Sequence, residues 1–349
     1  MGKNSNKGLP YVKYRFICPV CSNEKWQKLE KYKIPKDTVT VGRKWKQRIE
    51  FLPSAIRILL LARPARQPIC KRHISNNQFR RRRAYFDIGQ WPEAFESICC
   101  NKCGFICYTP RPTAQELEAT YMFLEKHDPF YDGPYDRSPE TAQMDRQRSE
   151  RVYKVIKPYL NGNAVLDFGG ANGIILTAFR DNGLQCHLAD YSDRQLPGIN
   201  KVANSLNDLQ GTYDCILLNH VLEHVAEPGD LLSGLNNHLN QKGLLYVEVP
   251  VEILAGVPRL EKDPVPHVNF FTDGSLKTIL RLNGYKVLSV FRGWSSYGRT
   301  MAYVTSAVAM KGNEQATFEP NITDALLYPK RIHAIDRFWK IVTKQASEL

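Results

Sequence analysis

Short apolar runs alternate with amphipathic segments along the second half of the chain. The apolar run at residues 164–166 has the length of a buried strand, and apolar residues return at helical spacing over residues 174–179. Further runs predict strands over residues 185–189, 200–203, 213–218, 243–249, 284–291 and 301–310. The spacing predicts helices over residues 146–160, 227–235, 273–282 and 323–343. Strands that alternate with helices predict a doubly wound α/β sheet.

A glycine-rich turn follows the first of these strands. It holds Gly169, Gly170 and Gly173, and Asp167 precedes it. A strand, a glycine turn and a helix in this order bring a nucleotide-like ligand against bare backbone, because glycine has no Cβ atom. The dinucleotide fingerprint G-x-G-x-x-G fails here, because its second glycine would be Ala171. An acid two residues before the first glycine instead suits a cationic ligand.

A second acid follows the next predicted strand. Asp190 comes 23 residues after Asp167, at the end of the strand over residues 185–189. An acid at this position can accept hydrogen bonds from the two hydroxyls of a ribose. The alternative interpretation is a loop aspartate that caps a helix.

The positive charge of the chain is concentrated in one segment. The net charge is +13 over 349 residues, a length with room for about two domains. Residues 31–86 hold 16 Lys or Arg against Asp37 and Glu50, a balance of +14, whereas residues 151–349 balance to +1. The half of the chain that carries the glycine turn is therefore nearly neutral, and the basic segment needs its own explanation.

Three interpretations of the basic segment stay open. The first is a solvated basic face around a small packed helix. The second is a membrane-surface element, because a short apolar helix flanked by Lys and Arg can lie on anionic lipid. The third is a contact with a phosphate-rich partner, such as RNA or a nucleotide-linked substrate.

Two C-x-x-C pairs predict a metal site. The pairs are Cys18 with Cys21, and Cys100 with Cys103. Such pairs are typical of a zinc ribbon, and four thiolates leave no open position, so the zinc would be structural. The pairs stand 78 residues apart, which an insertion at about residues 22–98 would explain. The alternative is four unrelated thiols, and two further cysteines, Cys99 and Cys107, leave the register of the second pair open.

The sequence indicates a cytoplasmic protein. No apolar run approaches the roughly 20 residues that span a bilayer, and the N-terminus is polar without a signal-peptide core. Gly2 does not match the myristoylation motif, because position six is Asn. Peripheral contact with the inner membrane surface, through residues 31–86, stays an alternative.

The strand and glycine turn resemble motif I of the class I S-adenosylmethionine (SAM) methyltransferases, hydrophobic-hydrophobic-Asp-x-Gly-x-Gly-x-Gly. Ala171 departs from this pattern at the middle glycine, where it is at least a small residue. The resemblance implies a Rossmann-like seven-stranded sheet that ends in an antiparallel pair. It also implies SAM as the cofactor, with the backbone of Gly169, Ala171 and Gly173 against it. Asp167 would then hold the methionine ammonium, and Asp190 the ribose.

Three more cofactor or acceptor contacts follow from the same resemblance. Asn204 or Ser205, after the third strand, would lie near the adenine. The segment Asn219-His-Val-Leu-Glu-His224 looks like the motif that follows strand four in the family, which implies that Asn219 or His220 lies near the methionine moiety. His224 and Glu223 would serve the acceptor or only brace the site.

A third histidine belongs to a further family-like segment. Pro266-His-Val-Asn-Phe-Phe-Thr272 resembles the family's His-x-x-x-Phe-Thr/Ser segment before the next helix. His267 is therefore a candidate base or substrate contact beside His220 and His224, because histidine accepts protons near neutral pH. A purely structural histidine is the alternative.

The N-terminal part has a resemblance of its own. The second cysteine knuckle, the Pro-Arg-Pro-Thr turn, the helix after Thr113 and a Tyr-rich segment look like the zinc-binding part of bacterial methyltransferases that modify sugars. The predicted organisation is then a zinc-ribbon region, a linker with a covering helix, a SAM-binding domain and a helical tail. Their ranges are residues 1–121, 122–160, 161–312 and 313–349.

The resemblances together predict a SAM-dependent methyltransferase. They imply a sugar or other small-molecule hydroxyl as acceptor, in a surface-polysaccharide or secondary-metabolite pathway. O-methylation is favoured over C-methylation, because the chain lacks the long C-terminal extension of many sugar C-methyltransferases. RNA methylation through the basic insertion is one alternative. A non-catalytic scaffold that docks on a membrane or partner is the other.

Overall fold

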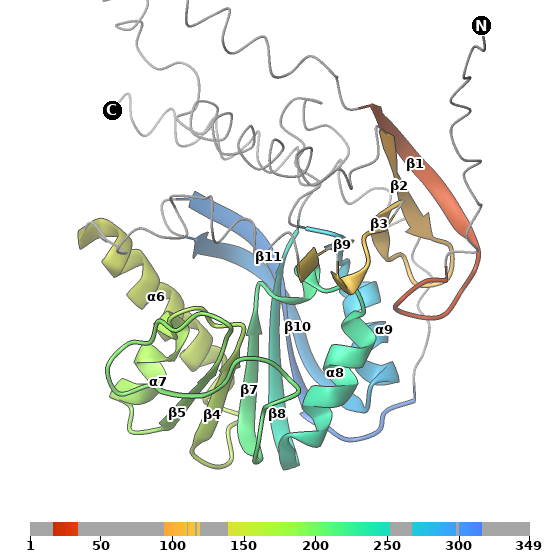
Figure 1. Cartoon of the computed structure of the whole chain (residues 1–349). Helices are drawn as coiled ribbons and strands as arrows, with labels where there is room; N and C mark the ends of the chain where they lie inside the picture. The colour runs from red at the N-terminus through yellow and green to blue at the C-terminus, as the bar shows by residue number, and fades with distance from the viewer. Residues whose placement is uncertain are drawn as a thin grey trace, which may run out of the picture.

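The computed structural model describes most of the predicted sheet domain and part of the N-terminal region (Figure 1). The described residues are 17–33, 94–109, 111–115, 117–118, 139–251, 267–297 and 300–315. Residues 34–93, which make up most of the basic insertion, lie outside this part of the chain. Residues 252–266 and the predicted tail helix at residues 323–343 also lie outside it.

The centre of the molecule is a seven-stranded sheet in the order β10-β11-β8-β7-β4-β5-β6 (Figure 1). Its strands are β4 (Ala164–Phe168), β5 (Gln185–Ala189), β6 (Asn200–Ala203), β7 (Tyr213–Asn219), β8 (Leu239–Pro250), β10 (Tyr285–Tyr297) and β11 (Thr300–Lys311). Strands β4 to β8 pair with one another in parallel, and β11 is antiparallel to both β8 and β10. This confirms the predicted class I methyltransferase fold, including its antiparallel pair.

Helices cover both faces of the sheet, as the apolar runs of its strands require. They are α6 (Pro139–Ile156), α7 (Thr177–Asp181), α8 (Pro228–Asn237) and α9 (Asp273–Leu282), with 3-10 turns η1 (Ile174–Leu176) and η2 (Leu222–His224). One core packs α6 and α7 against the sheet, and the other packs α8 and α9 against its opposite face. Burial on both faces explains why β7 is apolar almost throughout.

The helix predicted over residues 146–160 has different bounds in the structure. It begins at Pro139, seven residues before the predicted start. The prediction missed these residues because the first two turns are largely polar and carry no apolar spacing. It ends at Ile156, because Pro158 has no N–H group to continue the helix and disfavours helical backbone in the residue before it. The residues with helical spacing after the glycine turn form a 3-10 turn followed by a five-residue helix.

A smaller antiparallel sheet joins the N-terminal region to the sheet domain. Its order is β1 (Trp26–Lys33), β2 (Ala94–Cys100), β3 (Ile106–Thr109) and β9 (Asn269–Phe270). Cys107 of β3 is opposite Asn269 of β9, a strand that begins two residues after His267. The rings of Phe105 and Phe271 pack 5.2 Å apart across this junction. The N-terminal region therefore shares a sheet and a hydrophobic core with the larger domain.

Among the described residues, no helix combines the length and the apolar character needed to cross a membrane.

Candidate functional site

The predicted site residues gather at the carboxyl edge of the parallel strands. The chain runs from β4 outward through β5 and β6, then returns to place β7 on the other side of β4. The glycine turn after β4 and residues 219–224 after β7 therefore flank the point where the strand order reverses. Open α/β sheets bind their ligands in the crevice at such a point.

Two glycines of the turn have conformations that a side chain would disturb. Gly169 has φ +72°, and a Cβ atom there would lie 2.7 Å from Cγ2 of Val221. Gly173 has φ +79°, and its Cβ would lie 2.9 Å from Cδ1 of Ile199. The contact with Val221 places the turn after β7 directly against the glycine turn.

Ala171 matters more than its small size alone indicates. Its φ is +54°, in the left-handed region, which costs a non-glycine residue about 1–2 kcal/mol. The backbone N–H of Ala171 donates a 2.9 Å hydrogen bond to Oδ2 of Asp190, which helps to hold this conformation. The departure from the family pattern thus keeps the shape of the turn at a local energetic cost.

Asp190 lies beside the glycine turn, at the end of β5. Its side chain is buried, and its Oδ1 accepts a 2.8 Å hydrogen bond from the N–H of Ser192, while Oδ2 accepts that of Ala171. A carboxylate has about four acceptor positions, so these two bonds leave capacity for ribose hydroxyls. The structure places Asp190 against the glycine turn, and its role as a ribose contact stays a prediction.

Asp167 is completely buried beneath the glycine turn. A Cβ atom on Gly170 would lie 2.3 Å from its Oδ2. Burial raises the pKa of Asp167 to about 7, although the charge of Arg148 and the amide of Asn219 oppose this rise. Within the described part of the chain, neither oxygen of Asp167 has a hydrogen-bond partner of good geometry. A buried carboxylate with so little compensation suits a cationic ligand such as the SAM ammonium.

The raised pKa of Asp167 gives a testable pH dependence. The native state binds the proton more tightly than the unfolded chain, so this group lowers stability as pH rises from about 4 through 7. Asp167→Asn should remove this loss, which is at most about 4 kcal/mol. Urea unfolding without SAM at pH 5 and pH 8 measures it. If the variant and the wild type differ in free energy of unfolding by the same amount at both pH values, the raised pKa of Asp167 is contradicted.

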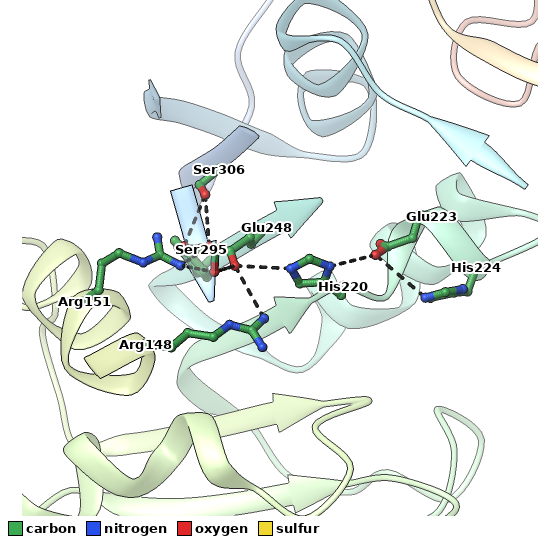
Figure 2. A network of polar contacts seen from close by, with 9 residues as sticks. Arg148, Arg151, His220, Glu223, His224, Glu248, Ser295 and Ser306 are labelled. Carbon is green, nitrogen blue, oxygen red and sulfur yellow. Dashed lines mark hydrogen bonds and ion pairs between the residues drawn. The ribbon is translucent and has the colours of Figure 1, made fainter. Parts of the chain in front are cut away.

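His220 joins two glutamates at the centre of a buried polar network (Figure 2). Its Nδ1 lies 3.3 Å from Oε1 of Glu223, and its Nε2 lies 3.4 Å from Oε1 of Glu248. Burial opposes the charged imidazolium, but these two carboxylates outweigh burial and raise the pKa of His220. The residue has φ +56°, which turns the chain sharply at the end of β7.

Glu248 is the hub of this network. It lies on β8 with a completely buried side chain, and Arg151 donates to its Oε2 at 2.6 Å while Arg148 donates to its Oε1 at 3.4 Å. Three hydroxyls complete the contacts, from Tyr246 at 2.8 Å, Ser295 at 2.9 Å and Ser306 at 3.3 Å. Burial opposes ionisation, but His220 and the two arginines hold the pKa of Glu248 well below its usual range.

Glu223, His224 and His267 form a second cluster, next to His220. Nε2 of His224 lies 3.7 Å from Oε1 of Glu223, and the rings of His224 and His267 stand 4.6 Å apart. The carboxylate of Glu223 is buried, whereas both imidazoles are half-buried. The structure thus brings together two histidines that lie 43 residues apart in the sequence.

Backbone contacts fix the two segments that carry this cluster. The N–H of Val268 donates to the carbonyl of Glu223 at 2.8 Å, and Nδ2 of Asn269 donates to the carbonyls of Leu222 and Val225. Arg111 adds hydrogen bonds to the carbonyls of Val225, Ala226 and Val268. The Pro-Arg-Pro-Thr turn of the N-terminal region therefore helps to position the histidines.

Two further predicted cofactor contacts differ in burial. Asn219 is buried at the end of β7, beside Asp167. Asn204 is exposed after β6, where its backbone N–H donates to Asp208 at 2.8 Å. Asn219 is therefore buried next to the strand that leads into the glycine turn, whereas Asn204 lies on the surface at the end of β6.

The four predicted metal-ligand cysteines converge at one end of the N-terminal sheet, before β1 and around the turn between β2 and β3. Cys18, Cys21, Cys100 and Cys103 are buried, with their sulfur atoms within 4.8 Å of one another. The Sγ atoms of Cys18 and Cys103 are 3.7 Å apart, and those of Cys21 and Cys100 are 3.5 Å apart. Tetrahedral zinc with bonds of about 2.3 Å places its sulfur ligands about 3.8 Å apart, so these residues fit the ion.

Sequence reasoning missed Arg111, Arg148, Arg151 and Glu248. The available signal for Glu248 was an acid inside an otherwise apolar strand, because a buried charge needs partners. The arginines carried no comparable signal. Their partners lie far away in the sequence, so they can be identified only from the folded structure.

Comparison with known proteins agrees with the fold. Residues 142–290 match a protein family described as "Methyltransferase domain". The match covers the glycine turn, Asp190 and the three histidines. Together with the sheet order, it supports a SAM-dependent methyltransferase. No curated protein matches the chain in sequence.

Solved structures of methyltransferases resemble part of the chain. A 1,6-didemethyltoxoflavin-N1-methyltransferase from Burkholderia thailandensis shows 17% identity over 62% of this chain and 96% of that chain, with a TM-score of 0.44. The magnesium protoporphyrin IX methyltransferase from Synechocystis PCC 6803 shows 18% identity over 55% and 91%, with a TM-score of 0.38. A SAM-dependent methyltransferase from Methanosarcina mazei shows 15% identity over 46% and 99%, with a TM-score of 0.39. At these scores none of the three informs the substrate of this chain.

Proposed function

We propose that the protein transfers the methyl group of SAM to a hydroxyl of a small molecule, such as a sugar in a surface-polysaccharide or secondary-metabolite pathway. The observation that carries methyl transfer is the glycine turn between β4 and η1, with Asp167 beneath it and Asp190 beside it. The preference for a sugar rests on the sequence resemblance of the N-terminal region and of the motif after β7.

In this proposal the chain binds and orients SAM through its own carboxylates and backbone. Gly169, Ala171 and Gly173 present backbone to the cofactor, and the buried charge of Asp167 attracts the ammonium. The sulfonium of SAM is already a strong leaving group, so the protein mainly needs to align the acceptor oxygen with the methyl carbon.

The acceptor lies at the histidine cluster. Val221 touches the glycine turn, so the residues on either side of it border the cofactor. Both ring nitrogens of His220 face glutamates, and its side chain is 9% exposed, so it serves as a positioning residue. His224 and His267 are half-buried, and in this proposal they contact the acceptor.

Asp190→Asn tests the cofactor site. Loss of the charged acceptor for two ribose hydroxyls should weaken SAM binding about 100-fold, or about 2.8 kcal/mol. Equilibrium binding measures it, and Asp193→Asn is the matched control, because the side chain of Asp193 is fully exposed and pairs with Lys201. Equal affinity of Asp190→Asn and wild type would show that SAM does not bind here.

We also propose that the four cysteines hold one structural zinc ion. All four thiolates would be ligands, so the ion would stabilise the N-terminal sheet without taking part in the reaction. The support is the spacing of the sulfur atoms and their burial.

A further inference from the structure

Glu223, His224 and His267 place one carboxylate and two imidazoles around a common point. One ligand atom from each lies within 4.8 Å of the others. We propose that these three side chains bind a first-row divalent metal ion, such as Mn²⁺, Fe²⁺ or Zn²⁺, at the acceptor end of the site. This site is separate from the four cysteines, which lie at one end of the N-terminal sheet.

The donor set suits such an ion. Two imidazoles with one carboxylate bind first-row divalent metals and leave coordination positions open, whereas Mg²⁺ prefers oxygen ligands. In a tetrahedral site with bonds of about 2.0–2.1 Å, the ligand atoms stand about 3.3 Å apart. The half-buried rings of His224 and His267 would have to move inward to reach this spacing.

The carboxylate of Glu223 is buried beside three imidazoles, those of His220, His224 and His267. It is 1% exposed, and within the described residues neither of its oxygens accepts a hydrogen bond of good geometry. His220 at 3.3 Å and His224 at 3.7 Å lie only at ion-pair distance. A divalent cation at the common point would compensate the buried carboxylate and would take both half-buried imidazoles as ligands.

The surroundings resemble the outer shell of a metal site. Nδ1 of His220 faces Glu223, while its other nitrogen faces Glu248 (Figure 2). Metal-ligating groups are commonly oriented by such second partners. The hydrogen bond from Val268 to the carbonyl of Glu223, and those of Arg111, fix the backbone on both sides of the cluster.

Glu223 and His224 follow Val221, which lies against the glycine turn, so a metal ion here would act in methyl transfer. This role rests on the proposed function. The acceptor hydroxyl would coordinate the ion, which lowers the pKa of that hydroxyl, and its proton would pass to water. The resulting oxygen then forms a bond to the methyl carbon. The carbon–sulfur bond breaks with its electron pair retained by sulfur, which gives a methyl ether, S-adenosylhomocysteine and one released proton.

Titration of the full-length protein with Mn²⁺ tests the site, with electron paramagnetic resonance reporting free ion. The protein is first loaded with one equivalent of zinc per chain, which the four thiolates take in preference to imidazole and carboxylate ligands, so that the new site starts empty. Mn²⁺ favours oxygen and nitrogen ligands over thiolates, so it reports the new site and not the cysteines. We expect one Mn²⁺ per chain. His267→Ala and Glu223→Gln should each weaken binding at least about 10- to 100-fold, the loss typical of even an outer-shell partner.

His238→Gln is the matched control. His238 lies at the end of α8, near the opposite edge of the sheet, with Nδ1 2.9 Å from the carbonyl of Gly211, and its replacement should leave Mn²⁺ binding unchanged. SAM titration of each variant shows whether the fold persists. Absence of Mn²⁺ binding by wild-type protein, or wild-type affinity in Glu223→Gln, overturns the proposal. SAM binding without Mn²⁺ binding would leave the proposed methyl transfer intact.

Discussion

Replacing Cys103 with serine is expected to remove one zinc ion per chain and to destabilise the protein by roughly 5 kcal/mol or more. Binding of structural zinc is itself folding free energy, with apparent values of about 10–16 kcal/mol in zinc-finger peptides. Loss of one thiolate should therefore weaken the whole N-terminal sheet. Because β9 is part of that sheet, the backbone next to His267 should loosen as well.

Metal analysis of the purified variants measures this effect, together with their urea unfolding. Cys99→Ser is the matched control, because Cys99 is buried next to Cys100 but is not one of the four clustered cysteines. It should keep its zinc. Equal zinc content in wild type and Cys103→Ser would show that the four thiols do not form a metal site.

Replacing Glu248 with glutamine should lower the free energy of unfolding by about 3–5 kcal/mol. Removal of one partner from a buried ion pair leaves the other charge uncompensated, and Glu248 has two buried or partly buried arginines as partners. His220 would also lose its contact at 3.4 Å. Denaturant unfolding at neutral pH measures the loss.

The matched control for this change is Glu150→Gln. Glu150 pairs with Arg146 on the exposed surface of α6, where such pairs contribute about 0.3–0.5 kcal/mol. The pKa of Glu248 is depressed, so its stabilisation should be lost as pH falls through that lowered pKa. The difference between wild type and Glu248→Gln should therefore shrink in acid. A loss no larger than that of Glu150→Gln would contradict the role of Glu248 as a hub.

The sheet could be predicted from the sequence because its strands are short apolar runs. Strands β5 and β6 match their predicted ranges, and α9 matches the helix predicted over residues 273–282. The start of α6 could not be predicted, because its first turns are largely polar. The left-handed backbone of Ala171 and His220 could not be predicted either, because both conformations depend on neighbours that only the folded chain supplies.

The candidate site was predictable where one short motif holds the chemistry. Asp167 and the glycine turn are such a case, and so are the residues from Asn219 to His224. The buried network was not predictable, because Glu248 meets Arg148 across 100 residues of sequence. The meeting of His224 with His267 likewise depends on how β9 pairs with the N-terminal sheet.

Calorimetric titration of the full-length, zinc-loaded protein with SAM and with S-adenosylhomocysteine tests the central claim most directly. We expect one equivalent of each to bind, with micromolar affinity, because in the proposed site the glycine turn, Asp167 and Asp190 would contact parts that both molecules share. Binding of neither molecule would contradict the account and would leave the glycine turn as a structural feature of the sheet.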